Sequence, residues 1–253
     1  MYTKPKNASP QQMIFGLYPV LEAVDAGREI SKVLLRKGID GDTYRKLTGV
    51  LYKYDIPVHV VPVEKLNRVT RKNHQGIIAF VSPIEYVRIE NLIPTLFEKG
   101  DTPFIVVCEG VTDTRNIGAI ARSAECSGAQ AILLPAKGTA MISADAVKAS
   151  AGALNHITVC RTDNLKSTLV FMKNSGLKIV ATSEKAKDIY YDADLTGPVA
   201  LLLGAEDTGI STEYLRMADA TVKIPVKGQI SSFNVSAAAA VIMCEIVKQN
   251  QHI

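Results

Sequence analysis

The pattern of apolar and polar positions divides the chain into two parts. Over the first 85 residues, apolar side chains spaced three or four apart predict helices at 17–26 and 44–54. Short runs rich in Val, Ile and Leu predict strands at 33–35, 58–61 and 76–81. The first part is therefore expected to be a small α/β unit.

The second part alternates between the two patterns more regularly. Strands are predicted at 104–108, 131–134, 157–160, 178–181, 199–203 and 221–224. Helices or helical pieces are predicted at 89–98, 117–126, 144–154, 164–173, 212–217 and 234–249. Because these strands are almost continuously apolar, helices are expected to cover both faces of their sheet. The predicted fold class is α/β with a mostly parallel sheet.

The boundary between the parts is predicted from Ser82, Pro83 and the charged stretch that follows. We expect domains at 1–85 and 103–253, joined by a linker at 86–102. The chain has 253 residues, 47% of them hydrophobic and 21% charged. A chain of this length and composition buries a core without disulfides, which excludes disorder as its main state.

Positive charge is concentrated in the first part. Residues 1–85 contain 13 Lys and Arg against 8 Asp and Glu, a net charge of +5, whereas the rest of the chain carries −1. Such asymmetry favours a polyanion as partner of the first part, and a merely soluble surface is the alternative.

The cysteines and histidines are scattered. No CxxC pair occurs, and neither residue type has the spacing of a metal site, so no metal is expected. Each cysteine lies in an apolar stretch, which predicts four packed, reduced thiols in a cytoplasmic protein. No apolar run approaches the roughly 18 residues of a membrane span, and the N-terminus lacks the apolar region of a signal peptide.

Three predicted strands are followed by loops that mix glycines with polar residues. They are EGVTDTRNIGAIAR after 104–108, GAEDTG after 199–203 and PVKGQISSFNVS after 221–224. Ligands of parallel sheets bind beyond the carboxyl ends of the strands, and glycine lets the backbone approach a ligand closely. Ordinary turns with Asn116, Thr212 and Asn234 as helix caps are the alternative for any single loop. Three such loops in one sheet favour a binding site.

Common nucleotide and hydrolase motifs do not occur. The chain has no Gly-x-Gly-x-x-Gly fingerprint, no Walker loop and no Gly-x-Ser-x-Gly nucleophile elbow. The three loops instead resemble motifs 1, 2 and 3 of the SpoU (TrmH-type) family of the SPOUT superfamily, in the order of that family. The residues that carry the resemblance are Asn116-Ile117-Gly118 with Arg122, then Gly204-Ala205-Glu206 with Gly209, then Ile224-Pro225 and Ser232-Phe233-Asn234-Val235-Ser236.

The first part also resembles a known domain. Phe15-Gly16-Leu17 and His74-Gln75-Gly76 are similar to the small L30e-like substrate-binding domain of the subgroup that methylates a guanosine of 23S ribosomal RNA. We expect His74-Gln75-Gly76 to be structural, preparing the strand that follows, with RNA contact as the lesser alternative. The resemblance implies an L30e-like N-terminal domain and a C-terminal SPOUT domain with a deep trefoil knot.

The resemblance further implies S-adenosylmethionine-dependent methylation of a ribose 2′-hydroxyl. It places the cofactor against main chain at Leu203, Gly204, Ile224 and Phe233. Phe233 stands where the family usually has Leu, and Asp207-Thr208 where relatives often have Gly and a variable residue. The implied catalytic residues are Asn116, Arg122, Glu206, Ser232 and Asn234.

Chemistry refines these roles. A guanidinium holds its proton strongly, so Arg122 is expected to grip the target phosphate and stabilise charge on the attacking oxygen rather than act as base. Glu206 would orient Arg122 or the ribose, and Asn116, Ser232 and Asn234 would position the ribose and one another. Relatives are homodimers whose active site draws on both subunits, so a homodimer is expected.

The expected substrate is 23S ribosomal RNA, which the resemblance of the separate basic first domain to that subgroup implies. Two alternatives stay open: a methyltransferase of transfer RNA, and a weakly catalytic assembly factor that binds ribosomal RNA. A generic nucleotide-binding α/β protein is least favoured, since no phosphate loop occurs.

Overall fold

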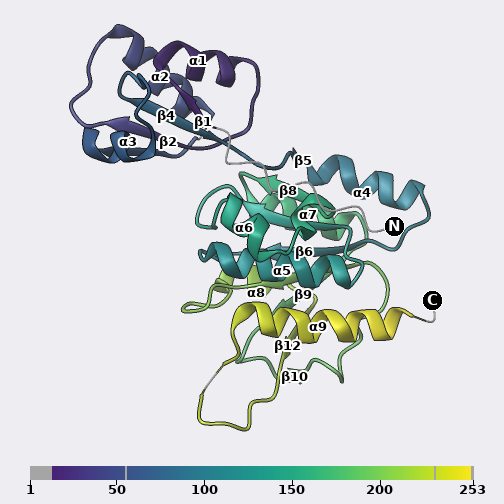
Figure 1. Cartoon of the computed structure of the whole chain (residues 1–253). Helices are drawn as coiled ribbons and strands as arrows, with labels where there is room; N and C mark the ends of the chain where they lie inside the picture. Colours follow the sequence, from purple (N-terminus) through teal and green to yellow (C-terminus); the bar gives the residue numbers. More distant parts are fainter. Residues whose placement is uncertain (1–12, 55, 231, 252–253) are drawn as a thin grey trace, which may run out of the picture. The chain divides into compact units, whose positions relative to one another are not determined.

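The computed structural model describes residues 13–54, 56–230 and 232–251 and contains two compact units (Figure 1). The first unit comprises the described residues up to Glu85 and the short segment Ile142–Ala144, and the second comprises Tyr86–Met141 and the described residues from Asp145 onward. Each unit has its own sheet. The α/β fold class that the sequence predicts is thus confirmed.

The first unit is built on a four-stranded sheet in the order β1-β4-β2-β3. Its strands are β1 (Met13–Phe15), β2 (Ile30–Arg36), β3 (Val58–Val61) and β4 (Ile77–Val81). Its helices are α1 (Leu17–Asp25), α2 (Asp42–Lys53) and α3 (Val63–Val69). β2 and β3 run parallel, and the other pairs are antiparallel. β1 was not predicted, because three residues are too few to show strand alternation.

Two separate clusters of apolar side chains pack against this sheet. Val33 and Leu35 of β2 belong to the cluster that includes α1 and α2, whereas Leu34 packs with Leu66 of α3. Successive side chains of a strand point to opposite faces. The run of apolar residues in β2 therefore reflects burial on both faces of the sheet.

The His74-Gln75-Gly76 segment joins several elements of the first unit. The Gly76 N–H donates to Nδ1 of the buried His74 at 3.0 Å, and His74 Nε2 lies 2.9 Å from Oδ1 of Asn67. The side-chain oxygen of Gln75 accepts the N–H of Leu17, the first residue of α1, at 3.0 Å. These bonds satisfy a free helix N–H and fix the entry to β4. The structural role predicted for this segment is confirmed.

The second unit is built on an eight-stranded sheet in which every pair is parallel, in the order β10-β12-β9-β11-β6-β7-β8-β5. Its strands are β5 (Tyr86–Val87), β6 (Phe104–Cys108), β7 (Ala131–Pro135), β8 (Thr158–Thr162), β9 (Lys178–Thr182), β10 (Asp188–Ile189), β11 (Val199–Leu203) and β12 (Ala220–Lys223). The prediction of a mostly parallel sheet is confirmed. The two-residue strands β5 and β10 were not predicted.

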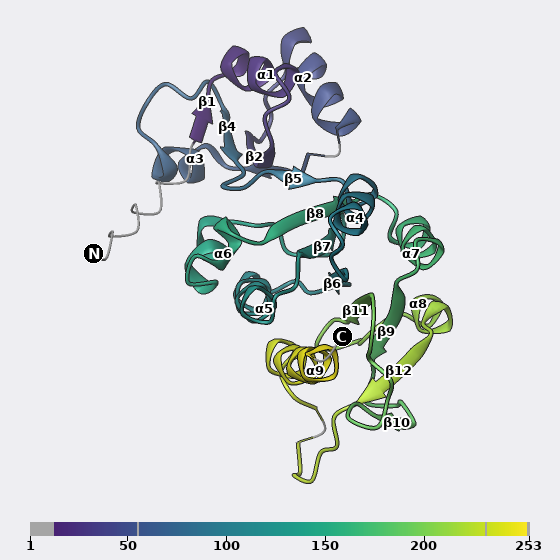
Figure 2. The same cartoon turned by 90° about the vertical axis from the view of Figure 1, so that its right-hand side faces the viewer.

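Helices cover both faces of this sheet. They are α4 (Ile89–Glu98), α5 (Thr114–Cys126), α6 (Ala144–Ala149), the short 3₁₀ helix Ala153–Asn155, α7 (Leu165–Asn174), α8 (Thr212–Met217) and α9 (Val235–Asn250). Figure 2 shows α5, α6 and α9 on one side and α4, α7 and α8 on the other. This arrangement explains why the strands are apolar throughout.

Residues 86–102, predicted as a linker, are part of the second unit. β5 pairs with β8, and α4 buries Ile89, Ile93 and Leu96 in the core beneath the sheet. The spacing of these three side chains forms a single apolar helix face. Burying that face against the sheet makes the segment part of the folded unit. The charged residues before it indicated a linker in the sequence, but they do not prevent this packing.

The cysteines differ from the prediction in one respect. Cys108 and Cys160 are buried, and burial raises the pKa of each thiol to about 12. Cys126 and Cys244 are exposed, so the expectation of four packed thiols is wrong for these two. They lie on the outward faces of α5 and α9. Within the described residues, no helix is long and apolar enough to cross a membrane.

Candidate active site

The site forms where two neighbouring strands end. β6 and β11 pair in register, with Cys108 opposite Leu203 at their carboxyl ends. The next residue, Glu109, donates its N–H to the carbonyl of Leu203 at 2.8 Å. The loops that carry motifs 1 and 2 therefore start side by side. The trefoil knot implied by the resemblance stays a prediction.

The motif 2 loop, residues 204–209, is a tight turn. Ala205 and Gly209 exchange two backbone hydrogen bonds of 3.2 and 2.9 Å, and Gly209 has a φ of +67°. A Cβ at Gly204 would lie 2.3 Å from the carbonyl carbon of Gly209 and 2.4 Å from the nitrogen of Ile210. Only glycine fits there, and the turn presents the exposed Glu206 at its tip.

Residues from all three motifs meet in one hydrogen-bonded group, which we call the Asn116–Glu206–Asn234 cluster. The side-chain nitrogen of Asn234 donates to Oδ1 of Asn116 at 3.1 Å and to a carboxylate oxygen of Glu206. The side-chain oxygen of Asn234 accepts the N–H of Ser236 at 3.0 Å and caps α9. The side-chain amide of Asn234 therefore caps α9 and also links the motif 3 loop to motifs 1 and 2.

The start of α5 is fixed by a different residue from the one considered in the sequence. Asp113, rather than Asn116, is the N-cap, and its carboxylate accepts the N–H of Arg115 at 2.7 Å. It also pairs with the Arg115 guanidinium at 2.8 Å. These hydrogen bonds lower the pKa of Asp113 and raise the pKa of Arg115. The negative charges of Asp113 and Glu206 raise the pKa of Arg115 further. Similarly, Ser211 rather than Thr212 occupies the N-cap position of α8, although its side chain makes no capping hydrogen bond.

Arg115 was missed in the sequence, although it directly precedes Asn116. An open groove beside it runs between the starts of α5 and α6 and is lined by Asp113, Thr114, Arg115, Asp145, Lys148 and Ala149. Arg115 and Lys148 are both exposed along this groove. The two cations of the groove are balanced by the carboxylates of Asp113 and Asp145, and Arg115 is already paired with Asp113. The groove therefore carries no net formal charge.

Two predicted catalytic residues lie outside the cluster. Arg122 and Ser232 are exposed, and neither makes a hydrogen bond or ion pair with any other described residue. Arg122 lies about two helical turns beyond Arg115, on the same face of α5. Its guanidinium is therefore available to an anion from outside, as a phosphate-gripping role requires.

The predicted cofactor residues lie at strand ends and in the motif 3 loop. Leu203 and Gly204 are buried, and Ile224 is half-buried. Phe233 is 49% exposed. Val226 and Ile230 in the same loop are also exposed. This donor set fits S-adenosylmethionine, because strand-end amides and carbonyls can read the edge of adenine while apolar side chains cover its faces. No metal-binding group of acidic, His or Cys side chains occurs within the described residues.

Glu109 is a second residue that the sequence analysis did not single out. Its carboxylate accepts the N–H of Ser211, just beyond the motif 2 loop, at 3.1 Å. Its own N–H bonds Leu203 just before that loop. Half-burial raises the pKa of the Glu109 carboxyl. Glu109 therefore holds both ends of the loop that carries Glu206.

Comparison with known proteins identifies the family of the chain. Residues 103–244 match the SpoU rRNA methylase family, and residues 13–87 match the substrate-binding domain of RNA 2′-O ribose methyltransferases. The TrmH family protein YacO of Bacillus subtilis (strain 168) is 30% identical over 93% of this chain and 95% of its own. The tRNA/rRNA methyltransferase slr0955 of Synechocystis is 34% identical over 94% of this chain and 62% of its own.

Solved structures share the fold. A crystal structure of an RNA 2′-O ribose methyltransferase aligns with a TM-score of 0.56 and 26% identity, covering 94% of this chain and 88% of its own. The AdoMet-bound rRNA methyltransferase of Sinorhizobium meliloti aligns with a TM-score of 0.60 and 24% identity, over 93% and 86% of the two chains. The protein is thus an RNA methyltransferase. It belongs to the SpoU methylase family, whose methyl donor is S-adenosylmethionine.

Proposed function

We propose that the protein transfers the methyl group of S-adenosylmethionine to a ribose 2′-hydroxyl of 23S ribosomal RNA. The Asn116–Glu206–Asn234 cluster carries this proposal. It gathers one polar side chain from each of the three motifs, at the carboxyl ends of parallel strands, where ligands of such sheets bind.

The reaction depends more on aligning the ribose oxygen with the methyl group than on activating the methyl donor. When bound, S-adenosylmethionine supplies a methyl group on a sulfonium, which is already a strong electrophile. Holding a reacting oxygen in place can lower the barrier by about 7–11 kcal/mol at best. The Glu206 carboxylate has lone pairs beyond the one that Asn234 uses, and these can orient a ribose hydroxyl. The exposed Arg122 and Ser232 grip the target phosphate and the ribose in this proposal.

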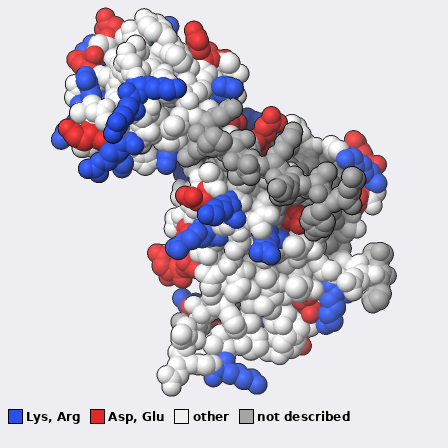
Figure 3. Space-filling view, viewed as in Figure 1, with Lys and Arg blue, Asp and Glu red and all other residues white. Residues whose placement is uncertain are grey.

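Basic side chains of the first unit support the proposal that this unit binds the RNA substrate. Exposed cations lie on α3 and the turn that follows it; they are Lys65, Arg68, Arg71 and Lys72. Figure 3 shows Lys and Arg side chains gathered on the visible face of this unit, over the region of α3. Clustered cations of this kind bind phosphate backbones.

Transfer RNA is the second candidate substrate, because relatives are named as tRNA/rRNA methyltransferases. A ribosome assembly factor with little catalysis is less well supported, because Asn116, Glu206 and Asn234 are present and bonded to one another. The test is transfer of radiolabelled methyl from S-adenosylmethionine to purified, unmodified 23S ribosomal RNA and to unmodified transfer RNA. Label in 23S RNA alone is expected. Label only in transfer RNA would overturn the substrate, and label in neither would overturn the activity.

We further propose a homodimer whose active site draws on both subunits. The exposure of Arg122 and Ser232 leaves room for a partner's side chains to complete the site. Light scattering of the purified protein at micromolar concentration is expected to give twice the 27.3 kDa chain mass. A monomer would contradict this. The four free thiols support a cytoplasmic location, which localisation of a tagged full-length protein tests.

A further inference from the structure

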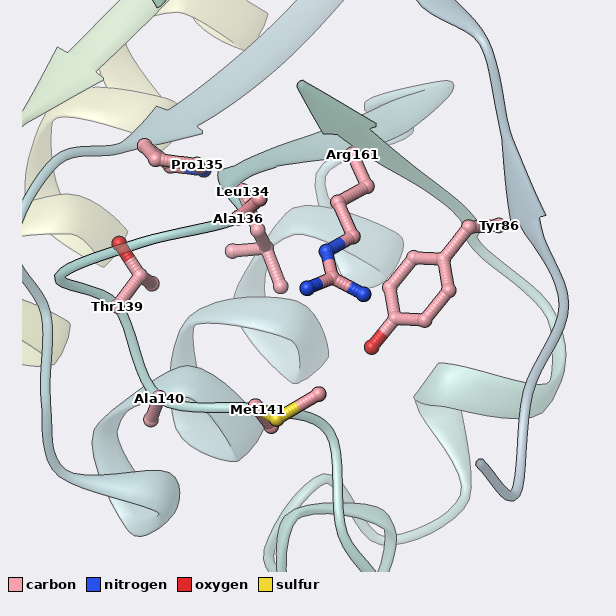
Figure 4. A pocket seen from close by; sticks show the side chains of 8 residues that line it. All are labelled: Tyr86, Leu134, Pro135, Ala136, Thr139, Ala140, Met141 and Arg161. Carbon is pink, nitrogen blue, oxygen red and sulfur yellow. The ribbon is translucent and has the colours of Figure 1, made fainter. Parts of the chain in front are cut away.

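A small pocket lies at the carboxyl ends of β7 and β8, outside the motif loops (Figure 4). It is lined by Tyr86, Leu134, Pro135, Ala136, Thr139, Ala140, Met141 and Arg161. Leu134 and Arg161 lie opposite each other in the paired strands. The space that it encloses is only about 10 Å³, about the room of one water molecule. A ligand larger than water would therefore bind at the mouth of the pocket rather than inside it.

The pocket holds a cation without a counter-charge. The guanidinium of the half-buried Arg161 lies 5.5 Å from the centre of the Tyr86 ring. Figure 4 shows the guanidinium pointing into the pocket beside that ring. Among the described residues, no carboxylate pairs with Arg161. Stacking on an aromatic face orients an arginine while leaving its N–H groups free to bind an anion.

A single loop separates the pocket from motif 1. Residues 136–141 form one wall of the pocket, and the same loop bonds to the end of β6 and the start of motif 1. The Ala140 N–H donates to the carbonyl of Val111 at 2.8 Å, and the Thr139 hydroxyl donates to that of Cys108 at 3.4 Å. Since β6, β7 and β8 are adjacent and parallel, the pocket lies about 10 Å along the sheet edge from the motif 1 loop.

We propose that this pocket binds a backbone phosphate of the RNA substrate, with Arg161 as its ligand and Tyr86 as the residue that orients Arg161. The inference rests on the proposed function. A separation of about 10 Å places this phosphate within a few nucleotides of the active site, so the contact would fix the RNA chain close to the nucleotide that is methylated.

The test is the salt dependence of RNA binding by the full-length protein. A fluorescein-labelled single-stranded RNA oligonucleotide is titrated with wild type and variants between about 50 and 200 mM salt, and anisotropy gives the affinity. Arg161→Ala is expected to reduce the slope of log affinity against log salt by about 0.7, the value for one lost phosphate contact. Tyr86→Phe, which keeps the ring, is expected to bind as wild type. Arg161→Lys is expected to keep the slope and lose affinity, because lysine lacks the planar fork.

Arg216→Ala is the matched control. Arg216 is exposed on α8, at the amino-terminal edge of the sheet, and its loss removes one equal charge from the opposite edge. Its slope is expected to match wild type. If Arg161→Ala and Arg216→Ala give the same slope, the proposal is overturned. A thermal unfolding midpoint and S-adenosylmethionine affinity equal to wild type show that Arg161→Ala is folded. If Arg161→Ala does not fold, the test is the RNA affinity of Arg161→Lys, and wild-type affinity in that variant would overturn the proposal.

Inorganic phosphate is the second probe, because a free anion could occupy the same pocket. A shift of the Arg161 Nε NMR signal by phosphate, with an unchanged RNA slope in Arg161→Ala, would make this a free-anion site and overturn the proposal. Methyl transfer is measured separately. If wild type transfers no methyl group but Arg161→Ala reduces the salt slope, the proposed function is overturned and the phosphate site stands. If wild type transfers the methyl group and Arg161→Ala leaves the slope unchanged, only the phosphate site is overturned.

Discussion

The side-chain nitrogen of Asn234 lies 3.1 Å from the side-chain oxygen of Asn116, although 118 residues separate them in the chain. The same amide caps α9 through its oxygen. Because capping fixes which way the amide faces, its N–H₂ group must point toward Asn116 and Glu206. The fold of the C-terminal helix thus determines the geometry of the cluster, and several predictions can separate the two roles of Asn234.

Asn234→Ser and Asn234→Ala should differ in stability and agree in activity. Serine caps a helix about as well as asparagine, but its side chain is too short to reach Asn116 and Glu206. Alanine loses the cap as well, which costs about 1 kcal/mol. Both variants are expected to lose about 100-fold or more in methyl transfer, and only Asn234→Ala should unfold at lower urea concentration. Wild-type turnover in Asn234→Ser would contradict a role for the cluster.

Arg122→Ala should abolish methyl transfer and keep S-adenosylmethionine binding. Arg122 is exposed and makes no hydrogen bond or ion pair with any other described residue, so its loss is expected to remove an RNA contact and leave the fold intact. Calorimetric titration with the cofactor and a methyl-transfer assay measure the two properties, with Arg216→Ala as the control that should retain both. Parallel losses of binding and transfer would indicate a folding defect and sink the assigned role.

Glu109→Gln should preserve activity, whereas Glu109→Ala should reduce it. Glutamine still offers an oxygen to the Ser211 N–H, while alanine leaves that N–H without its partner. Loss of the hydrogen bond is expected to cost about 0.5–1.5 kcal/mol and to loosen the loop that carries Glu206. Urea unfolding and methyl-transfer rates measure both effects. Equal activity of the two variants would show that the Ser211 contact does not matter.

The pKa of Glu109 gives a pH test of the burial of its carboxyl group, which outweighs the opposite effect of the Ser211 hydrogen bond. Burial raises this pKa above its ordinary value of 4.5, so the folded state holds the proton more tightly than the unfolded state. Stability from this group is therefore full below about pH 4.5 and is lost as pH rises through the raised pKa. Glutamine does not titrate, so Glu109→Gln has no such loss. The free energy of unfolding of this variant should therefore rise relative to wild type as pH rises from about 4.5 through the raised pKa. A constant difference across the window would be inconsistent with a raised pKa.

Gly204→Ala should destabilise the second unit and weaken cofactor binding. Its Cβ would approach the backbone of Gly209 and Ile210 to 2.3 and 2.4 Å, and backbone cannot move aside as a flexible side chain can. Overpacking of this kind costs about 1–3 kcal/mol. Gly228→Ala is the matched control, because a Cβ there meets nothing within 4 Å. Scanning calorimetry should show a lower transition only for Gly204→Ala; similar transitions would argue against the close approach.

Strands with strong local signals could be predicted from the sequence. Phe104–Cys108 and Val199–Leu203 are five-residue apolar runs, and both are fully buried strands with the predicted bounds. Asn234 could be considered as a cap because it precedes an apolar helical pattern. By contrast, β1, β5 and β10 have only two or three residues, which is too short for any periodicity to appear.

Contacts between distant loops could not be predicted in the same way. Glu109 bonds Ser211 across 102 residues, and nothing in the local pattern of either segment indicates the other. The pairing depends on β11 lying next to β6, an order that spacing alone does not determine. The Arg161–Tyr86 contact likewise needs β5 beside β8. Motif resemblance supplied Asn116, Glu206 and Asn234, whereas only the structure shows how they are bonded.

The most direct test of the central claim is a map of 2′-O-methyl groups in total RNA from cells with and without this protein, read by sequencing after alkaline cleavage. A 2′-O-methyl group blocks cleavage at its nucleotide, so each lost mark shows as a new cut. The account predicts loss of a single mark, in 23S ribosomal RNA, restored by the wild-type protein and not by Arg122→Ala. An unchanged map in ribosomal and transfer RNA alike would contradict it.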